Sequence, residues 1–290
     1  MDGILLIDKP AGPTSHDVVF RMRKATGESR IGHTGTLDPL ATGLLVLCLG
    51  RAAKLVKYLT EHDKTYFAEI VFGYRTDTLD AEGTVLEKMP CPPIPESRLD
   101  EVLHGFLGTS EQVPPLYSAL KVDGKKLYEY ARDDEEVPRL GGRPVEVYSL
   151  ERLSPLIPEG ETARLAVRLH CGKGFYVRSF ARDLGERLGV PATLGRLRRE
   201  TVGPFSLSDA APLADAQQGK YVLLDPFPFL GMPVLRADAE TKKKVANGMF
   251  LSPVLFEKKV PTVLADETGT PLAIYEYDER IDKMRLSVLW

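Results

Sequence analysis

The sequence is poor in the features that place a protein in a membrane or outside the cell. Its 290 residues include no run of eighteen apolar residues, so we expect no membrane-spanning helix. The opening MDGILLIDKP lacks the basic start and the cleavage site of a signal peptide, which predicts a cytoplasmic location. Only three cysteines are present, Cys48, Cys91 and Cys171. They lie far apart without a CxxC pair, so we expect neither a disulfide framework nor a structural zinc.

The common cofactor motifs are also missing. We find no GxxxxGK[ST] loop, no GxGxxG that opens a helix, no HExxH and no cluster of histidine and cysteine. The stretch CGKGF at 171–175 has a lysine between glycines, but not at the spacing of a phosphate-binding loop. We therefore expect no cofactor and no metal, and a reaction that side chains perform unaided.

Charge is nearly balanced over the whole chain, but basic residues are concentrated in two segments. The net charge is −3, with 43% apolar and 27% charged residues, as in ordinary soluble proteins. Between Arg164 and Arg199, however, nine basic residues accompany only two acidic ones, which gives a local charge of +7. A second basic group comprises Lys121, Lys125 and Lys126. Such groups indicate either a surface for the phosphates of a nucleic acid or a solvated helix face.

Hydrophobic periodicity divides the chain into strands and helices in mixed order. Apolar or alternating runs predict strands at 3–8, 44–50, 64–73, 145–153 and 163–171. Helical spacing predicts helices at 15–24, with Ser15 as the N-cap, and at 51–59, 97–106 and 178–189. Strands outnumber helices and occur both in hairpin-like pairs and between helices, so we predict an α+β (mixed α/β) core.

Two stretches depart from this core. The segment 109–143 is polar and rich in turns, and we interpret it as an insertion that covers something. After LLDPFPFLG at 223–231, the proline spacing marks a boundary, followed by a short helix at 238–246 and small strands. We therefore predict a large domain over 1–230 and a small, mostly β domain over 231–290.

The segment GHTGTLDPLATG at 32–43 combines three glycines and three threonines with one histidine and a single acid, Asp38. An aspartate before proline is common in turns, where its carboxylate accepts hydrogen bonds from nearby backbone N–H groups. His33 is similarly typical of a surface group that forms hydrogen bonds. A lone carboxylate can also act as a nucleophile, and the segment by itself does not decide between these roles.

Seven motifs in order are more specific than any single pattern. They are DKPAGPTSHDVV, RIGHTGTLDPLATGLLVLCLG, KTYFAEIVFGYRTDTLDAEG, PPLYSALKVDGKKLYEYAR, GRPVEVY, HCGKGFYVRSFARDLGERLG and LRRETVGPF. In this order they resemble the TruB family of tRNA pseudouridine synthases, over about residues 3–205. The resemblance implies a pseudouridine synthase-like core, a mixed, largely antiparallel sheet flanked by helices. The tail after Gly231 is only weakly similar, and family members often carry a small RNA-binding PUA-like domain there.

The resemblance implies an enzyme that isomerises uridine 55 in the T loop of tRNA to pseudouridine. The bond between N1 and the sugar breaks, the base rotates, and C5 joins the sugar. A uridine stacked inside a folded loop is inaccessible, and enzymes that act on such bases flip them out. We expect the T stem-loop of tRNA as partner, no required protein partner, and a monomer.

The resemblance also implies the catalytic residues. The essential aspartate of the family falls on Asp38, which would add to C6 of the base, add to C1′, or abstract a sugar proton; these three routes stay open. Each route uses the ionised carboxylate, and burial raises the pKa of an aspartate unless a cation offsets it. Arg178 matches the family's arginine, so we predict an Asp38–Arg178 ion pair. Tyr66 matches the tyrosine that stacks on the base.

Further matches imply residues that bind the substrate. His33 falls where the family contacts the T loop at the gap left by flipped bases, and Asp80 matches a polar residue near the target base or its neighbours. Tyr176 lies two residues before Arg178, so on a strand both side chains would face the same side. Leu197 matches an apolar wall under the base.

The lysines have different implied roles. Lys9, in DKPAGPTS, is expected to be structural or to make a backbone contact. Lys121, Lys125, Lys126 and Arg143 lie in or beside the insertion, which in the family clamps the tRNA. Folding over RNA would explain the polar composition of this segment.

Three functions remain to be compared. The first is a stand-alone tRNA pseudouridine synthase. The second is the related RNA-guided synthase of archaea and eukaryotes, which usually has a longer tail and basic extensions that this chain lacks. The third is a catalytically silent tRNA-binding or folding module, against which the intact Asp38, Tyr66 and Arg178 argue. The sequence favours the first, because LYSALKVDGKKLYEYAR matches the bacterial type.

Overall fold

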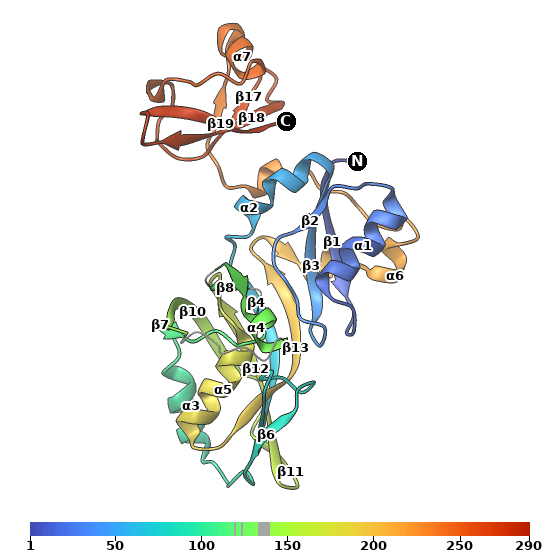
Figure 1. Cartoon of the computed structure of the whole chain (residues 1–290), viewed down its shortest axis with the longest axis vertical. Coiled ribbons are helices and arrows are strands. Elements are labelled where there is room, and N and C mark those ends of the chain that lie inside the picture. Colours follow the sequence, from blue (N-terminus) through green and yellow to red (C-terminus); the bar gives the residue numbers. More distant parts are fainter. Residues whose placement is uncertain (119, 123, 133–139) are drawn as a thin grey trace.

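A computed structural model of the chain describes residues 1–118, 120–122, 124–132 and 140–290. One large sheet carries most of the helices, and a second, small sheet lies toward the C-terminal end of an elongated molecule (Figure 1). The large sheet has eleven strands, eight of them in the order β15-β1-β3-β13-β4-β12-β10-β7. The other three are attached at its sides, β2 to β3, β11 to β12 and β14 to β13.

Parallel and antiparallel pairs are mixed in the large sheet. Among the described strands, β1 pairs with β15 and β3 with β13 in parallel, while the remaining pairs are antiparallel. This confirms the predicted mixed, largely antiparallel sheet. The bounds are β1 Gly3–Lys9, β2 Ile31–His33, β3 Thr42–Leu49, β4 Lys64–Phe72, β7 Gly108–Gln112, β10 Arg143–Arg152, β11 Ile157–Glu159, β12 Thr162–Cys171, β13 Ala192–Val202, β14 Phe205–Ser206 and β15 Ala211–Pro212.

β13 lies in the middle of the sheet, between β3 and β4, although no strand was predicted there. Its pairing with β4 shifts register twice, between Leu194 and Arg196 and again between Arg199 and Thr201. Each shift inserts an extra residue and reverses which side chains face the core. The period-two pattern that identifies a strand is therefore lost from the sequence, and arginines occupy positions where alternation would place apolar residues.

Helix α1 spans Ser15–Thr26 and is capped by the residue just before it. Thr14, and not Ser15, is the N-cap: its side chain accepts from the backbone N–H of Asp17, whose carboxylate accepts from the Thr14 backbone N–H in return. The prediction of Ser15 as the cap is wrong, because this reciprocal capping box favours Thr14. Ser15 is instead buried inside the first turn, where its hydroxyl is available to a neighbouring loop.

Helices α3 (Glu96–His104) and α5 (Val177–Leu188) pack together on one face of the large sheet (Figure 1). Phe106, just after α3, meets Phe180 of α5 edge to face with ring centroids 4.9 Å apart. The buried stripe of α5 against β13 and β4 includes Phe180, Ala181 and Leu184, each 0% exposed. The start of α5 is thereby fixed over the centre of the sheet.

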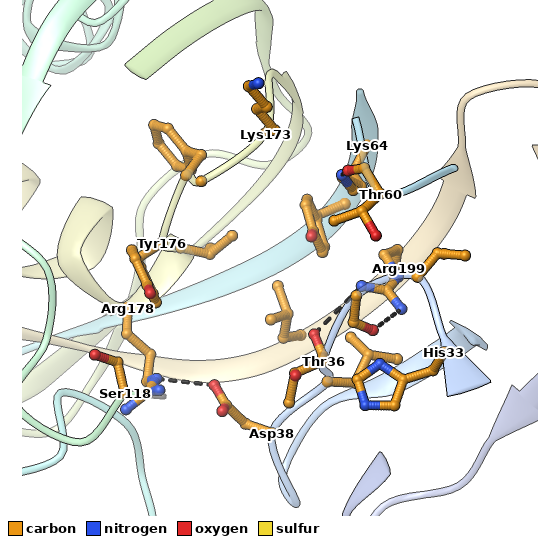
Figure 2. Close-up of a pocket in the computed structure, with 18 of the residues that line it drawn as sticks. His33, Thr36, Asp38, Thr60, Lys64, Ser118, Lys173, Tyr176, Arg178 and Arg199 are labelled. Carbon is orange, nitrogen blue, oxygen red and sulfur yellow. Dashed lines mark hydrogen bonds and ion pairs between the residues drawn. The ribbon is translucent and has the colours of Figure 1, made fainter. Parts of the chain in front are cut away.

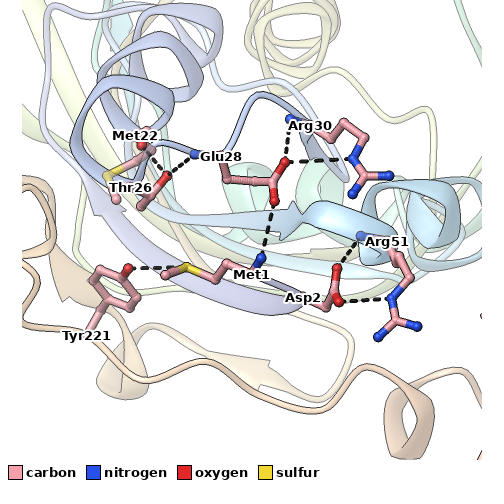
Figure 3. Close-up of polar contacts among 8 residues, drawn as sticks. All are labelled: Met1, Asp2, Met22, Thr26, Glu28, Arg30, Arg51 and Tyr221. Atoms are coloured by element: carbon pink, nitrogen blue, oxygen red, sulfur yellow. Dashed lines mark hydrogen bonds and ion pairs between the residues drawn. The ribbon is translucent and has the colours of Figure 1, made fainter.

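The beginning of the chain is held by polar contacts at the edge of β1 (Figure 3). The backbone N–H of Arg51 donates to the Asp2 carboxylate at 2.6 Å, and Nε of the Arg51 side chain donates to the same carboxylate at 2.9 Å. The amino group of Met1 lies 3.3 Å from the carboxylate of Glu28. Arg51 belongs to the 3-10 helix η1 (Gly50–Leu55), which leads into α2 (Val56–Leu59).

The small sheet consists of β16 (Val234–Arg236), β17 (Thr262–Ala265), β18 (Pro271–Asp278) and β19 (Lys283–Leu289), with α7 (Ala239–Ala246) beside it. Its Val263, Ile274 and Val288 belong to the same apolar cluster as Ile4 and Leu44 of the large sheet. Lys57 of α2 also pairs with Glu276 at 2.7 Å. The two sheets therefore share a packed interface. None of the helices in the described part of the chain combines the length and apolarity needed to cross a membrane.

The remaining elements connect the sheets or project from them. Residues 109–112 lie in β7 and residue 143 begins β10, so the described residues of the 109–143 segment that lie outside the large sheet are 113–118, 120–122, 124–132 and 140–142. The other bounds are β5 Tyr74–Thr76, β6 Val85–Lys88, β8 Lys121–Val122, β9 Lys125–Lys126, α4 Leu127–Arg132, α6 Leu213–Ala216 and the 3-10 helices η2 Leu207–Asp209, η3 Phe227–Phe229 and η4 Pro253–Leu255.

Candidate active site

A cavity of about 650 Å³ opens where the loop 33–39, the faces of β4 and β13, and the start of α5 meet (Figure 2). Residues from these four segments lie far apart in the sequence and come together only in the fold. Six of the ten residues predicted for the site line this cavity: His33, Asp38, Tyr66, Tyr176, Arg178 and Leu197.

Lys9 and Ser15 hold the backbone of the loop that carries Asp38. The Lys9 ammonium is fully buried and donates to the carbonyls of Pro10, Pro39 and Ala41 at 2.9, 3.3 and 2.7 Å. The Ser15 hydroxyl donates to the Leu37 carbonyl at 3.0 Å and accepts from the Leu37 N–H at 2.8 Å. The expected structural role of Lys9 is confirmed. Burial lowers the pKa of Lys9 to about 8, while the charge of Asp38 acts in the opposite direction.

Arg199 of β13 holds the same loop from the other side. It is 1% exposed, and its guanidinium donates to the carbonyls of Leu44, Gly35 and Thr36 at 2.7, 3.1 and 3.4 Å. A buried guanidinium with three carbonyl acceptors fixes the backbone on both sides of Thr36.

The predicted ion pair between Asp38 and Arg178 is present. Nε of Arg178 lies 2.9 Å from Oδ2 of Asp38, and the arginine side chain is 6% exposed against 36% for the aspartate. Burial raises the pKa of Asp38, while the Arg178 guanidinium lowers it and the Asp80 carboxylate raises it. The carboxylate thus keeps an open side toward the cavity and a charged partner behind it.

Arg178 has further partners that fix its orientation. Its Nη1 donates to the Thr78 carbonyl at 3.1 Å and its Nη2 to the Tyr117 carbonyl at 2.9 Å. Oδ2 of Asp80 lies 3.9 Å from Nε. Contacts from three separate segments therefore position the guanidinium before any substrate enters.

Asp80 is not among the described residues that line the cavity. It is 6% exposed and lies behind Arg178. Its Oδ1 accepts from the Thr78 hydroxyl at 2.6 Å and from the Glu82 N–H at 3.1 Å. The preceding residue, Leu79, adopts a left-handed φ of 63°, which turns the chain and aims Asp80 inward. Asp80 is therefore placed to position Arg178.

Aromatic and apolar side chains form the floor of the cavity. Tyr66 of β4 is 9% exposed and Leu197 of β13 is 8% exposed, and burial raises the pKa of the Tyr66 phenol. His33 lies at the other side of Asp38 (Figure 2). Burial, with the nearby charge of Arg199, lowers the pKa of His33, so its imidazole is neutral at neutral pH.

The backbone that places Tyr176 and Arg178 at the cavity is the start of a helix and not the predicted strand. The argument that both would face one side of a strand is wrong, because Arg178 lies in the first turn of α5. Tyr176 is the extended residue before the helix, with φ −109° and ψ 112°. Gln112 holds it through both backbone groups, accepting from its N–H at 2.8 Å and donating to its carbonyl at 3.1 Å.

Of the predicted clamp lysines, Lys121 and Lys125 are not among the described residues that line this cavity. Lys121 pairs with Lys126, and Val122 with Lys125, in the β8–β9 hairpin. The Lys125 ammonium lies 5.0 Å from the centre of the Tyr130 ring. The side chain of Lys126 is outside the described part of the structure, as are residues 133–139.

The basic side chains of the window from 164 to 199 lie beside acidic side chains and backbone carbonyls. Seven of the nine pair with acids. These pairs are Arg164 and Arg196 with Glu69, Arg168 with Glu151 and Glu200, Lys173 with Glu61, Arg178 with Asp38, Arg182 with Asp183, and Arg198 with Asp8. The other two bind backbone: Arg187 donates to the Gly105 carbonyl, and Arg199 donates to loop carbonyls. Most of these acids lie outside the window in sequence and beside it in space. Acids from other segments therefore offset part of the local charge of +7, and the interpretation of this window as a phosphate surface stays a prediction.

Sequence reasoning missed several residues of the site. Lys64 lines the cavity two residues before Tyr66, and its ammonium donates to the Thr60 carbonyl at 2.9 Å and to that of His62. Arg199 was counted only as a charge, and Ser118 only as part of a motif. The period of two along β4 does place Lys64 beside Tyr66, whereas nothing in the sequence signals the buried position of Arg199.

The comparisons with known proteins point to one family. The family model described as TruB family pseudouridylate synthase (N terminal domain) matches residues 23–177. The chain is 44% identical to tRNA pseudouridine synthase B of Caldanaerobacter subterraneus over 251 residues, covering 87% of this chain and 86% of the relative. It is 40% identical to tRNA pseudouridine synthase B of Bacillus cytotoxicus over 290 residues, covering 96% and 93%.

The fold also matches a solved structure. The chain is similar to one in the crystal structure of a Cbf5-Nop10-Gar1 complex, with a TM-score of 0.70, 24% identity, and coverage of 99% of this chain and 84% of that one. At this identity the likeness speaks for the fold, while the family model and the close relatives speak for the family. The chain therefore belongs to the TruB family of pseudouridylate synthases, which are isomerases.

Proposed function

We propose that this protein converts uridine 55 in the T loop of tRNA to pseudouridine, with Asp38 as the catalytic carboxylate. The observation that carries the proposal is the Asp38–Arg178 pair at 2.9 Å, with the open side of Asp38 facing a cavity floored by Tyr66 and Leu197. The relatives named tRNA pseudouridine synthase B support tRNA as the substrate.

The reaction conserves all atoms of the uridine. The bond from N1 to C1′ breaks, the base rotates, a bond from C5 to C1′ forms, and the proton leaves C5 while N1 gains one. The ionised Asp38 attacks C6, attacks C1′ or removes a sugar proton to begin this sequence. Arg178 keeps the carboxylate charged in its partly buried site and holds it against the nucleotide.

The target base enters the cavity by flipping out of the T loop. Unstacking costs a few kcal/mol, and stacking on an aromatic ring returns about 1–3 kcal/mol. Tyr66 is placed to supply that ring, and Leu197 an apolar wall. The neutral His33 at the rim fills the gap that the flipped bases leave.

The remainder of the molecule binds the rest of the tRNA. Lys121, Lys125, Lys126 and Arg143, in or beside the segment that leaves the sheet, supply charge for phosphates and clamp the RNA. Residues 231–290 form a separate PUA-like domain that adds RNA contacts to those of the catalytic domain at 1–230. The protein acts as a monomer in the cytoplasm, without cofactor, metal or protein partner.

A single incubation tests the proposal and its alternatives. The purified protein, mixed with an unmodified tRNA transcript and no other RNA, is expected to form pseudouridine at position 55, mapped by chemical probing and mass spectrometry. Product only in the presence of a guide RNA would favour an RNA-guided synthase, and no product under either condition would favour a binding module.

Asp38→Asn separates binding from chemistry. The amide keeps the shape of the side chain but has no negative charge, so we expect pseudouridine formation to fall below detection while tRNA affinity changes less than threefold. Both are measured on the same preparation, by product mapping and by filter binding. Pseudouridine formed by Asp38→Asn at a rate near that of the native protein would refute the role given to Asp38.

A further inference from the structure

The Gln112 side chain holds the backbone of one residue of the site. Gln112 is the last residue of β7 and is 4% exposed. Its Oε1 accepts from the Tyr176 N–H at 2.8 Å, and its Nε2 donates to the Tyr176 carbonyl at 3.1 Å. Paired residues in antiparallel strands exchange the same two bonds, so the amide acts on Tyr176 as a neighbouring strand would. Two bonds in opposite directions fix both the place and the direction of the backbone at residue 176.

Tyr176 is the residue at which α5 begins. It is the N-cap of this helix, and its carbonyl accepts from the Phe180 N–H at 3.0 Å. A serine, threonine, aspartate or asparagine at the N-cap fixes the start of a helix with its own side chain. The Tyr176 side chain forms no such bond and lines the cavity instead. Gln112 therefore supplies from outside the helix the restraint that the N-cap side chain does not.

Arg178 depends on the same helix start, because it lies two residues further on, in the first turn of α5. Its guanidinium is held by the carbonyls of Thr78 and Tyr117, but its backbone follows the start of the helix. Nε of Arg178 lies 2.9 Å from the Asp38 carboxylate. A hydrogen-bonded ion pair this short weakens when either backbone is displaced.

The attachment of β7 to α5 does not by itself explain Gln112. The next residue, Val113, already joins the two segments, because its carbonyl accepts from the Ser179 hydroxyl at 2.8 Å and from Nη2 of Arg182 at 3.1 Å. Gln112 itself is not among the described residues that line the cavity. The distinct effect of its amide is therefore on residue 176, whose side chain does line the cavity.

We propose that Gln112 is a positioning residue for the reaction, because its hold on the start of α5 places the Tyr176 ring and the Arg178 guanidinium in the cavity. This inference rests on the proposed function above. Groups that act on a reacting nucleotide must stay within about 0.5 Å of their working geometry, and a misplacement of about 1 Å lowers a rate by up to about a hundredfold. The two bonds from Gln112 supply part of that precision without contact with the nucleotide.

The test compares Gln112→Met with the full-length native protein on a T stem-loop RNA. Methionine has nearly the length and volume of glutamine, so it fills the same space but forms neither bond to Tyr176. We expect the rate of pseudouridine formation on saturating RNA to fall about tenfold or more, while the affinity for the RNA changes less than about threefold. Should Gln112→Met not fold, Gln112→Asn tests the same bonds with the same expected results, because its amide is one methylene too short to reach both groups.

Ser179→Ala is the matched control. Ser179 is 0% exposed, and its bond to the Val113 carbonyl joins the same two segments without contact with residue 176. Both substitutions remove buried hydrogen bonds and should lower the urea midpoint of unfolding. Rates are compared well below the unfolding temperature of each variant, so that the fraction of folded protein does not enter. Only Gln112→Met should lower the rate on saturating RNA by more than about twofold.

The acid limb of kcat/KM gives a second readout, which a loss of stability alone does not move. Burial raises the pKa of Asp38, and three charged side chains also act on it, those of Arg178, Asp80 and Lys9. Of these three, only Arg178 lies in α5. A displaced Arg178 lowers the pKa of Asp38 less, so Gln112→Met should shift the acid midpoint to higher pH, and the control should not.

The outcomes separate the inference from the proposed function. A rate loss no larger than that of the control, a loss of RNA affinity in place of rate, or an unchanged acid midpoint would overturn the inference alone. A native protein that forms no pseudouridine would overturn the proposed function and the inference with it.

Discussion

Arg178 lies between two carboxylates, and the charge of Asp80 affects the ionisation of Asp38. Its Nε is 2.9 Å from Oδ2 of Asp38 and 3.9 Å from Oδ2 of Asp80. Burial raises the pKa of Asp38, Arg178 lowers it, and the negative charge of Asp80 raises it. Because the proposed chemistry uses the ionised Asp38, the balance of these effects decides how far into the acid range the enzyme works.

The signs of these effects predict opposite shifts for two variants. Activity should rise with pH on the acid side, with a midpoint above 3.8, the ordinary pKa of an aspartate. Arg178→Met removes the cation that lowers the pKa of Asp38, so the midpoint should move to higher pH. Asp80→Asn removes the charge that raises this pKa, so the midpoint should move to lower pH.

The measurement is kcat/KM on a T stem-loop RNA from about pH 4 to pH 8. Asn at position 80 can still accept from Thr78 and Glu82, so the loop around it should keep its shape. Shifts of both variants in the same direction would contradict the assignment of the acid limb to Asp38.

At the scale of elements, the loop that carries Asp38 ends where β3 comes closest to β13. Gly43 has a φ of +99°, and a Cβ there would lie 2.3 Å from the Arg199 carbonyl oxygen and 2.8 Å from its nitrogen. Both contacts are with backbone, which cannot move without breaking the parallel pairing of β3 and β13. Gly43, the last glycine of GHTGTLDPLATG, thus permits β3 to approach β13 closely. This approach also brings Arg199 to the loop whose carbonyls it binds.

Two alanine substitutions separate the cost of this approach from the cost of the dihedral angle. Gly12 has a nearly identical φ of +102°, but open space where a Cβ would be. Gly12→Ala is therefore expected to destabilise by about 1 kcal/mol, from strain alone. Gly43→Ala should cost this plus about 1–3 kcal/mol of overpacking, read from the urea midpoints. Equal losses for the two variants would show that β3 and β13 do not approach this closely.

The elements that the sequence predicted correctly have regular patterns. The strands at 3–9 and 64–72 and the helix at 177–188 agree with prediction within one residue, because each buries an unbroken apolar face. β13 was missed because two bulges break its alternation and its arginines bind backbone carbonyls and acids. The family resemblance placed Asp38 and Arg178 together and named Asp80, whereas the position of Asp80 behind Arg178 depends on the three-dimensional path of the loops.

At the scale of the whole molecule, charges that are separated in the sequence neutralise each other in space. The window from 164 to 199 carries a local +7, yet Arg168 pairs with Glu151, Arg198 with Asp8 and Lys173 with Glu61. A net charge summed over consecutive residues does not count the acidic partners that lie on other strands. Such sums overstate the positive surface of a sheet protein whose strands bring distant residues together.

The interface between the two sheets predicts how the whole molecule unfolds. Val263, Ile274 and Val288 of the small sheet are buried in a cluster that extends into the large sheet, and Glu276 pairs with Lys57 at its margin. Because neither sheet can lose this contact without exposing apolar surface of the other, we expect a single thermal transition for the chain.

Ile274→Ala tests this coupling. Ile274 is 1% exposed, so its truncation should cost about 2–5 kcal/mol and lower the Tm of the whole transition. Val254, in the same C-terminal part of the chain, is 92% exposed, and Val254→Ala should leave the Tm within the error of the measurement. Calorimetry and the fluorescence of Trp290, which packs on Phe227 with ring centroids 4.8 Å apart, should report the same midpoint. Two resolved transitions, with Ile274→Ala shifting only the one that Trp290 reports, would mean that the small sheet unfolds on its own.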